Sequence, residues 1–106
     1  MPVSGLDGTP STVALWTILE AASAQKILER APLQVRQKYE IWKRVVAFSG
    51  PHGLLGGRGY NDEALRGEWK GHRSSRLNDQ YRVIYRAEAR TTTVYVERVT
   101  PHDYRR

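Results

Sequence analysis

The apolar residues change their spacing along the chain, which predicts mainly helices before residue 50 and strands after residue 70. Between Leu33 and Phe48 they recur at intervals of four, three and four residues. This spacing predicts one helix with a single buried stripe. The stripe consists of Val35, Tyr39, Trp42 and Val46. Most of the polar and basic residues fall outside it, so its aromatic side chains are interpreted as core rather than as a ligand site.

A strand and a shorter helix are expected before this long helix. The apolar run Val13–Leu19 predicts a buried strand, although a run of this length also suits a helix. Ser23 is expected to cap a helix over Ala24–Arg30 that buries Ile27 and Leu28. The proline that follows should separate the two helices, because proline interrupts a helical hydrogen-bond ladder.

The second half of the chain predicts a loop and then three strands. Ser49–Gly59 is rich in glycine and lacks the Gly-Lys-Ser/Thr of a phosphate-binding loop, so we interpret it as a connector. Runs of β-branched and aromatic residues predict strands at Gly71–Leu77, Tyr81–Ala87 and Thr92–Val99. Together these elements predict an α+β fold in which two helices pack on a small, mostly antiparallel four-stranded sheet. Residues 1–12 are expected to be a flexible tail and residues 13–106 one domain.

The length of one turn decides which side chains share a face of the sheet. If residues 78–80 form a three-residue loop, Arg76 lies opposite Arg82. A two-residue loop would place Arg82 opposite Ser75 instead. The first alternative puts His72, Ser74, Arg76, Arg82, Ile84 and Arg86 on one side. The other side, expected to meet the helices, then carries Arg73, Ser75, Leu77, Tyr81, Val83 and Tyr85.

The net charge of +6 and the pI near 10.0 favour a polyanionic partner. Nine of the 17 basic residues lie in residues 67–106, against five acidic ones, so the surplus is expected on the sheet. Charge alone does not choose between RNA, DNA, the ribosome and an acidic protein. The absence of cysteine excludes disulfides and thiolate zinc sites. No apolar run is long enough for a membrane span and no secretory signal is visible, so a cytoplasmic protein is expected.

The residues of the second half could cleave RNA without a metal ion. Such a site needs a base for the 2′-hydroxyl, a cation for the phosphorane and an acid for the leaving oxygen. The chain offers Glu63, the arginines 76 and 82, and His72 or His102. Two opposed guanidinium groups would grip a phosphate between them, or each would pair with a nearby carboxylate. The same residue types, with tyrosines that stack on bases, also suit a module that only binds RNA.

The order of these residues resembles a known family. Glu63-Ala-Leu-Arg-Gly, Lys70-Gly and Arg76-Leu-Asn-Asp-Gln-Tyr-Arg-Val-Ile-Tyr are similar to the RelE/ParE superfamily of toxin–antitoxin toxins, especially its HigB, RelE and YoeB branches. The resemblance implies the RelE-like microbial RNase fold, no cofactor and no metal. It also implies an antitoxin partner and cleavage of mRNA in the A site of the 70S ribosome, by attack of the 2′-hydroxyl on its own phosphate.

The resemblance also assigns roles to individual residues. Glu63 is similar to the general base, and Arg82, supported by Arg76, to the ligand of the scissile phosphate. His102 and Tyr104 are similar to a C-terminal His/Tyr pair, and either could be the general acid. Residues expected to line the RNA or ribosome side are Lys70, His72, Arg73 and Arg86. Two rival functions remain: a ParE-like inhibitor of DNA gyrase, which shares the fold but needs no acid–base set, and an RNA-binding or ribosome-binding module that does not cleave.

Overall fold

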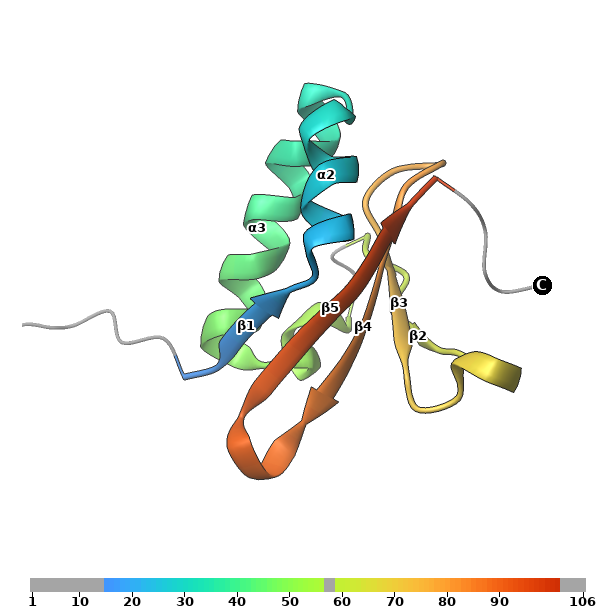
Figure 1. The fold of residues 1–106 in the computed structure, drawn as a ribbon. Helices are drawn as coiled ribbons and strands as arrows, with labels where there is room; N and C mark the ends of the chain where they lie inside the picture. Colours follow the sequence, from blue (N-terminus) through green and yellow to red (C-terminus); the bar gives the residue numbers. More distant parts are fainter. Residues whose placement is uncertain (1–14, 57–58, 102–106) are drawn as a thin grey trace, which may run out of the picture.

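The computed structural model describes residues 15–56 and 59–101, and it has two helices packed on one side of a five-stranded sheet (Figure 1). The elements in chain order are β1 (Thr17–Glu20), α2 (Ala22–Arg30), α3 (Leu33–Ser49), β2 (Glu63–Ala64), β3 (Arg73–Arg76), β4 (Arg82–Glu88) and β5 (Thr93–Thr100). Single 3₁₀ turns lie at 51–54, 67–69 and 89–91. The predicted α+β class is confirmed, while the predicted tail, residues 1–12, lies outside the described residues.

The sheet has the strand order β1-β5-β4-β3-β2 and is mixed. β1 runs parallel to β5, and the other three neighbouring pairs are antiparallel. The prediction of four strands was therefore wrong by one. The missed strand, β2, is only two residues long, too short to show the alternation of apolar and polar residues by which strands are recognised in a sequence.

Helix α3 agrees with its prediction, and its ends follow from the sequence. It begins directly after Pro32, contains neither glycine nor proline, and ends at Ser49, with Gly50 as its C-cap. Gly50 has φ +70°, a left-handed conformation that glycine adopts without strain. A Cβ atom there would lie 2.6 Å from Nε1 of Trp16, so the close approach of that indole also requires glycine.

Helix α2 differs from its prediction at its start and on its buried face. Its N-cap is Ala21, and Ser23 is the second helical residue rather than the cap. The reason is that β1 continues directly into the helix, since the Ala21 N–H still donates to Val96 of β5. Leu28 is buried as predicted, whereas Ile27 is exposed, because Ala24 and Leu28, four residues apart, form the face that packs inward.

Strand β1 is an edge strand, which corrects the expectation of a buried strand. Its residues alternate between exposed and half-buried, and Leu19 is exposed. Trp16 and Ile18 do pack against the core. A parallel edge strand has a neighbour on one side only, so its outer border keeps contact with solvent.

The core lies between the two helices and the sheet. Trp42 of α3 is fully buried; it stacks on Tyr39 at 5.6 Å between ring centroids and meets the edge of Tyr85 at 5.4 Å. The strands contribute mainly valines from β4 and β5, namely Val83, Val94, Val96 and Val99. Burying one such side chain contributes about 1.5–3 kcal/mol relative to leaving it exposed. The predicted stripe of α3 is therefore confirmed as core.

The β3–β4 turn has the three-residue loop, the first of the two alternatives left open by the sequence. Leu77 N–H donates to Tyr81 O at 2.8 Å, and Arg76 pairs with Arg82. The side chain of Asn78 accepts hydrogen bonds from the N–H groups of Gln80 and Tyr81, at 2.8 and 2.7 Å. An asparagine that binds its own turn in this way fixes the turn locally. Within the described ranges 15–56 and 59–101, no helix is both long and apolar enough to cross a membrane.

Candidate functional site

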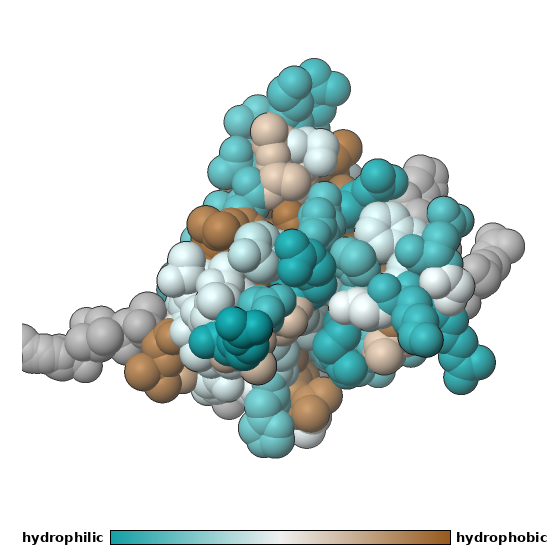
Figure 2. Space-filling view, turned by 60° about the horizontal axis from the view of Figure 1, so that its bottom comes forward, coloured by the Kyte–Doolittle hydropathy of each residue, from teal (hydrophilic) through white to brown (hydrophobic). Residues whose placement is uncertain are grey.

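The face of the sheet away from the helices brings together residues from all four strands β2 to β5. Across it, Glu63 pairs with Ser74, Ser74 with Ile84, and Ile84 with Arg98. We call this surface the basic face; it comprises Glu63, His72, Ser74, Arg76, Arg82, Ile84, Arg86, Tyr95, Glu97 and Arg98. Figure 2, in which the end of the molecule with the β4–β5 turn comes forward, shows mainly hydrophilic colours with small, separate hydrophobic areas.

Three predicted site residues meet around Ser74. Arg82 Nη1 donates a hydrogen bond of 3.1 Å to Ser74 Oγ, and Glu63 is the cross-strand partner of Ser74 on the other side. Arg76 lies two residues after Ser74 on β3 and pairs directly with Arg82 of β4. A carboxylate and two guanidinium groups are thus brought to one part of the basic face.

This part of the face is less open than the sequence suggested. Ser74 and Ile84 are fully buried, and Arg82 is only 5% exposed. Leu65 is also buried without belonging to the main core, and alternation along β2 places it on the side of Glu63. Its N–H donates to His72 O at 2.9 Å, so the chain after β2 folds back beside β3. Leu65 and Ile84 are therefore two buried apolar residues on the side of the basic face.

A β-bulge between β4 and β5 carries Glu97, one of the carboxylates that the sequence offers as partners for the arginines. Ile84 pairs with Arg98 but the next residue, Tyr85, pairs with Val96, which leaves Glu97 as the extra residue. Oε2 of Glu97 accepts a hydrogen bond of 3.0 Å from Arg86 Nε and lies 3.8 Å from His72 Nε2. Neither hydrophobic periodicity nor turn chemistry in the sequence indicates this bulge.

Two arginines of the basic face lie over aromatic rings. Arg86 lies 4.0 Å from the ring centroid of Tyr95, and Arg98 lies 5.4 Å from that of Trp69. Trp69 in turn meets His72 edge to face at 5.1 Å. Such contacts hold a guanidinium group in place while leaving its edge available for hydrogen bonds. Trp69 and Arg98 were not predicted as site residues, since the elements that carry them touch only after folding.

Arg73 lies on the opposite, helix-covered face, as the turn count predicted, so the structure does not bring it to Arg82. Its Nε donates to Asp62 Oδ1 at 2.6 Å, and Asp62 Oδ2 accepts from Ser75 Oγ and Tyr85 OH at 2.6 Å each. Although burial alone lowers the pKa of Arg73, the Asp62 carboxylate raises it above its ordinary value. Burial and Asp62 also raise the pKa of Tyr85. Asp62 was not singled out in the sequence.

Of the remaining predicted residues, one is exposed on the surface and two are not described by the structure. Lys70 is exposed just after the turn that carries Trp69. His102 and Tyr104 lie outside the described residues, so their assignment stays a prediction. Among residues 15–56 and 59–101, no three His, Asp or Glu side chains are grouped as metal ligands.

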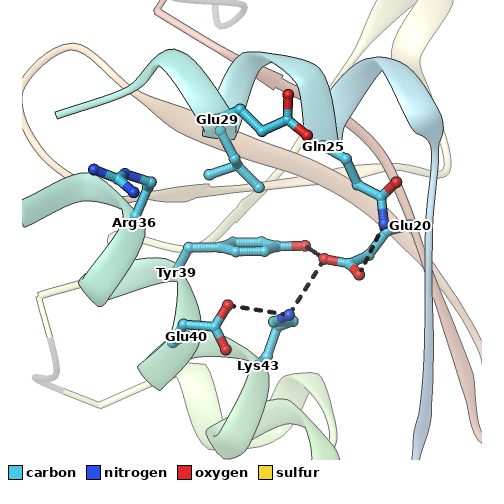
Figure 3. Close-up of a pocket in the computed structure, with 8 residues that line it drawn as sticks. Glu20, Gln25, Glu29, Arg36, Tyr39, Glu40 and Lys43 are labelled. Carbon is cyan, nitrogen blue, oxygen red and sulfur yellow. Dashed lines mark hydrogen bonds and ion pairs between the residues drawn. The ribbon is translucent and has the colours of Figure 1, made fainter. Parts of the chain in front are cut away.

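A polar pocket on the helix-covered side of the sheet is separate from the basic face. It has a volume of about 440 Å³ and is lined only by residues of β1, α2 and α3 (Figure 3). Tyr39 OH donates to Glu20 at 2.6 Å, and Lys43 Nζ lies 3.4 Å from Glu20 and 3.2 Å from Glu40. Burial raises the pKa of Glu20, but Tyr39 and Lys43 outweigh it and hold this pKa below its ordinary value. These groups satisfy one another within the pocket wall.

Comparison with known proteins finds similarity in structure rather than in sequence. No protein-family model matches the chain, and no curated protein sequence matches it. A YoeB/ParE toxin from Agrobacterium tumefaciens superposes with a TM-score of 0.66 at 20% identity, over 82% of this chain and 99% of its own. The YoeB dimer from Staphylococcus aureus gives 0.67 at 18% identity, over 85% and 100%. The archaeal RelE–RelB complex from Pyrococcus horikoshii gives 0.65 at 18% identity, over 81% and 93%. The chain therefore has the fold of the RelE/ParE superfamily of toxins.

Proposed function

We propose that this protein is the toxin of a type II toxin–antitoxin pair and that it cleaves messenger RNA on the ribosome. The observation that carries the proposal is the convergence of Glu63 and Arg82 on Ser74, with Arg76 opposite Arg82. A carboxylate beside two guanidinium groups is the set that proton abstraction and phosphate stabilisation require. The fold shared with RelE, YoeB and YafQ toxins supports the same function.

In the proposed reaction, Glu63 accepts the proton of a ribose 2′-hydroxyl. The 2′-oxygen then attacks the adjacent phosphorus, and the bond to the 5′-oxygen of the next nucleotide breaks. The products are a 2′,3′-cyclic phosphate and a 5′-hydroxyl end. Arg82 and Arg76 stabilise the extra negative charge of the phosphorane. His102 protonates the leaving 5′-oxygen with help from Tyr104, or the two exchange these roles; β5 ends at Thr100, opposite Arg82, shortly before both.

The surrounding cations of the basic face hold the RNA in this proposal. Arg86 and Arg98, with the neighbouring Lys70 and the imidazole of His72, extend this surface from the proposed reaction centre towards the β4–β5 turn. Arg73 is 37% exposed but bound to Asp62, so we expect its contribution to be the smallest. Each arginine or lysine that neutralises a phosphate releases a counterion, which makes the binding sensitive to salt.

The proposed partners are an antitoxin, the ribosome and mRNA, and the proposed location is the cytoplasm, where translation takes place. Several proteins of similar fold were solved with a partner: YoeB with YefM from Staphylococcus aureus, RelE with RelB, and YafQ with DinJ from E. coli. We infer that an antitoxin binds this chain and blocks the basic face.

A translation extract programmed with a defined mRNA tests the proposal. The wild-type protein should produce cuts only when ribosomes are present, and the upstream fragments should end in a 2′,3′-cyclic phosphate. Arg82→Ala should lose about 10²–10³-fold in cleavage rate, the usual cost of removing one stabilising donor. Glu63→Gln, which keeps the shape of the side chain, should lose at least as much.

Arg90→Ala is the matched control, because Arg90 is exposed in the turn between β4 and β5. This variant should cleave like the wild type. Intact mRNA with the wild-type protein would overturn the proposal. A gyrase supercoiling assay run in parallel separates the ParE-like alternative, since inhibition of supercoiling with intact mRNA would assign the protein to that class instead.

A further inference from the structure

Asp62 is a buried carboxylate that the proposed reaction does not use. Its side chain is fully buried, although its backbone lies in the irregular segment that precedes β2. It accepts three hydrogen bonds of 2.6 Å, from Arg73 and Ser75 of β3 and from Tyr85 of β4. A buried carboxylate is costly unless it is paired and hydrogen-bonded, and three donors including one cation meet that requirement.

The neighbouring strand β2 is short. β2 consists of Glu63 and Ala64 only and pairs with β3 alone, at the edge of the sheet. Two residues of ladder provide few hydrogen bonds, so such a strand frays easily. The segment before it turns sharply, with Asn61 at φ +49°, and is fixed by Tyr60, whose carbonyl accepts the N–H of Arg76.

Successive side chains along an extended strand point to opposite faces of a sheet. The partners of Asp62 show where its side chain lies: Tyr85 belongs to the helix-covered core, and Ser75 accepts a hydrogen bond of 2.9 Å from Trp42 of α3. Glu63 is therefore directed to the basic face, beside Ser74. Two consecutive acidic residues are thus directed to opposite faces of the sheet.

We propose that Asp62 is a positioning residue, which holds Glu63 in line with Ser74 and Arg82 through the backbone that the two acidic residues share. This inference rests on the proposed function for the role of Glu63, but the anchoring itself does not. A displacement of about 1 Å in a reacting group can cost on the order of 10²-fold in rate. Asp62 would therefore affect turnover without touching the RNA.

The first test compares Asp62→Asn with Tyr85→Phe. Asparagine keeps the size of the side chain but removes its charge and turns one acceptor into a donor. Tyr85→Phe removes a single donor and leaves Asp62 bound to Arg73 and Ser75. Asp62→Asn should lower kcat for ribosome-dependent cleavage by roughly 30-fold or more with KM nearly unchanged. Tyr85→Phe should keep kcat within about threefold at a temperature where both variants are fully folded.

The second test measures amide hydrogen exchange on the protein alone and needs no RNA. The Leu65 N–H, bonded to His72 O at 2.9 Å, reports on the end of β2, and the Gly50 N–H, bonded to Val46 O at 2.8 Å, reports on α3. In Asp62→Asn the exchange of Leu65 should speed up by about tenfold or more, while that of Gly50 stays within about twofold.

Unchanged exchange at Leu65 would overturn the anchor, whatever the protein cleaves. Faster exchange with an unchanged kcat would overturn the positioning role, and an equal loss of kcat in Tyr85→Phe would reduce Asp62 to a stabiliser of the core. If the wild type cleaves no RNA, the proposed function falls. In that case the exchange measurement alone decides whether Asp62 fixes the strand.

Discussion

The two faces of the sheet differ in how far their polar groups are buried and paired with one another. On the helix-covered face, Asp62 takes three hydrogen bonds and Trp42 donates to Ser75, so polar groups are satisfied inside the protein. On the basic face the four arginines outnumber the two glutamates. The ion pair of Arg86 with Glu97 is also partly exposed, at 40% and 36% of the two side chains.

This difference indicates which face contributes most to the stability of the fold and which face carries the groups proposed for binding and catalysis. A closed network in a low-dielectric interior contributes to a unique packing, and breaking it leaves a costly unpaired group. A surplus of cations at a surface contributes little to folding, because exposed ion pairs are worth at most about 1 kcal/mol. It does attract an anion. Changes on the covered face should therefore alter stability first, and changes on the basic face should alter binding and catalysis first.

The largest effect is expected from Trp42→Ala on the covered face. This change opens a cavity between Tyr39 and Tyr85, and it should lower the free energy of unfolding by about 3–5 kcal/mol. Urea denaturation followed by circular dichroism measures the loss. Phe48→Ala on the same helix, at an exposed position, should change it by less than about 0.5 kcal/mol. Similar losses in the two variants would contradict the assignment of Trp42, rather than Phe48, to the core.

Arg76→Ala on the basic face should produce the converse result. We expect the affinity for a single-stranded RNA to fall by about tenfold and the slope of log affinity against log salt to decrease by about one. The free energy of unfolding should change by less than about 0.5 kcal/mol, since a half-buried surface arginine contributes little to packing. Fluorescence anisotropy at several salt concentrations measures the binding. An unchanged salt slope would show that Arg76 meets no phosphate.

The smallest effect is expected from Tyr39→Phe in the pocket of the covered side. This variant loses the hydrogen bond to Glu20 and should lose about 1 kcal/mol of stability at neutral pH. The folded-state pKa of Glu20 lies below its ordinary value, so the stabilisation is present above the unfolded pKa and disappears as the pH falls through the folded pKa. Denaturation at a series of pH values should show wild type and variant converging in acid. A constant difference would exclude Glu20 as the partner.

The features of the fold that depend on residues close together in the chain could be predicted from the sequence. The buried stripe of α3 consists of four residues at helical spacing in a helix of 17 residues. The register of β3 on β4 follows from a turn in which the Asn78 side chain accepts hydrogen bonds from the backbone of the turn. These features are local, so the sequence contains their whole cause. The same register placed Arg76 opposite Arg82 and Val83 and Tyr85 in the core, as the structure has them.

Features that depend on distant contacts could not be predicted. Ser23 looks like a cap, but the pairing of Ala21 with β5 starts α2 earlier. Strand β2 exists because β3 provides a partner, and Glu97 reaches Arg86 only through a bulge. Asp62 has no recognisable motif, because its three donors come together only once β3 and β4 are paired. The burial of Arg82, whose Nη1 donates to Ser74 Oγ of the neighbouring strand, was also not predicted.

The parallel pairing of β1 with β5 has a consequence for when the protein can fold during its synthesis. Thr17 pairs with Thr93, so β1, the first described strand, can join the sheet only after β5, the last described strand, has been synthesised. Such non-local pairings slow folding because a long loop has to close first. A nascent chain whose β5 residues are not yet available for folding also lacks Val94, Val96 and Val99 of the core. It lacks Glu97 and Arg98 of the basic face as well. Incomplete chains should therefore remain unfolded, and the basic face should appear only when synthesis has passed β5.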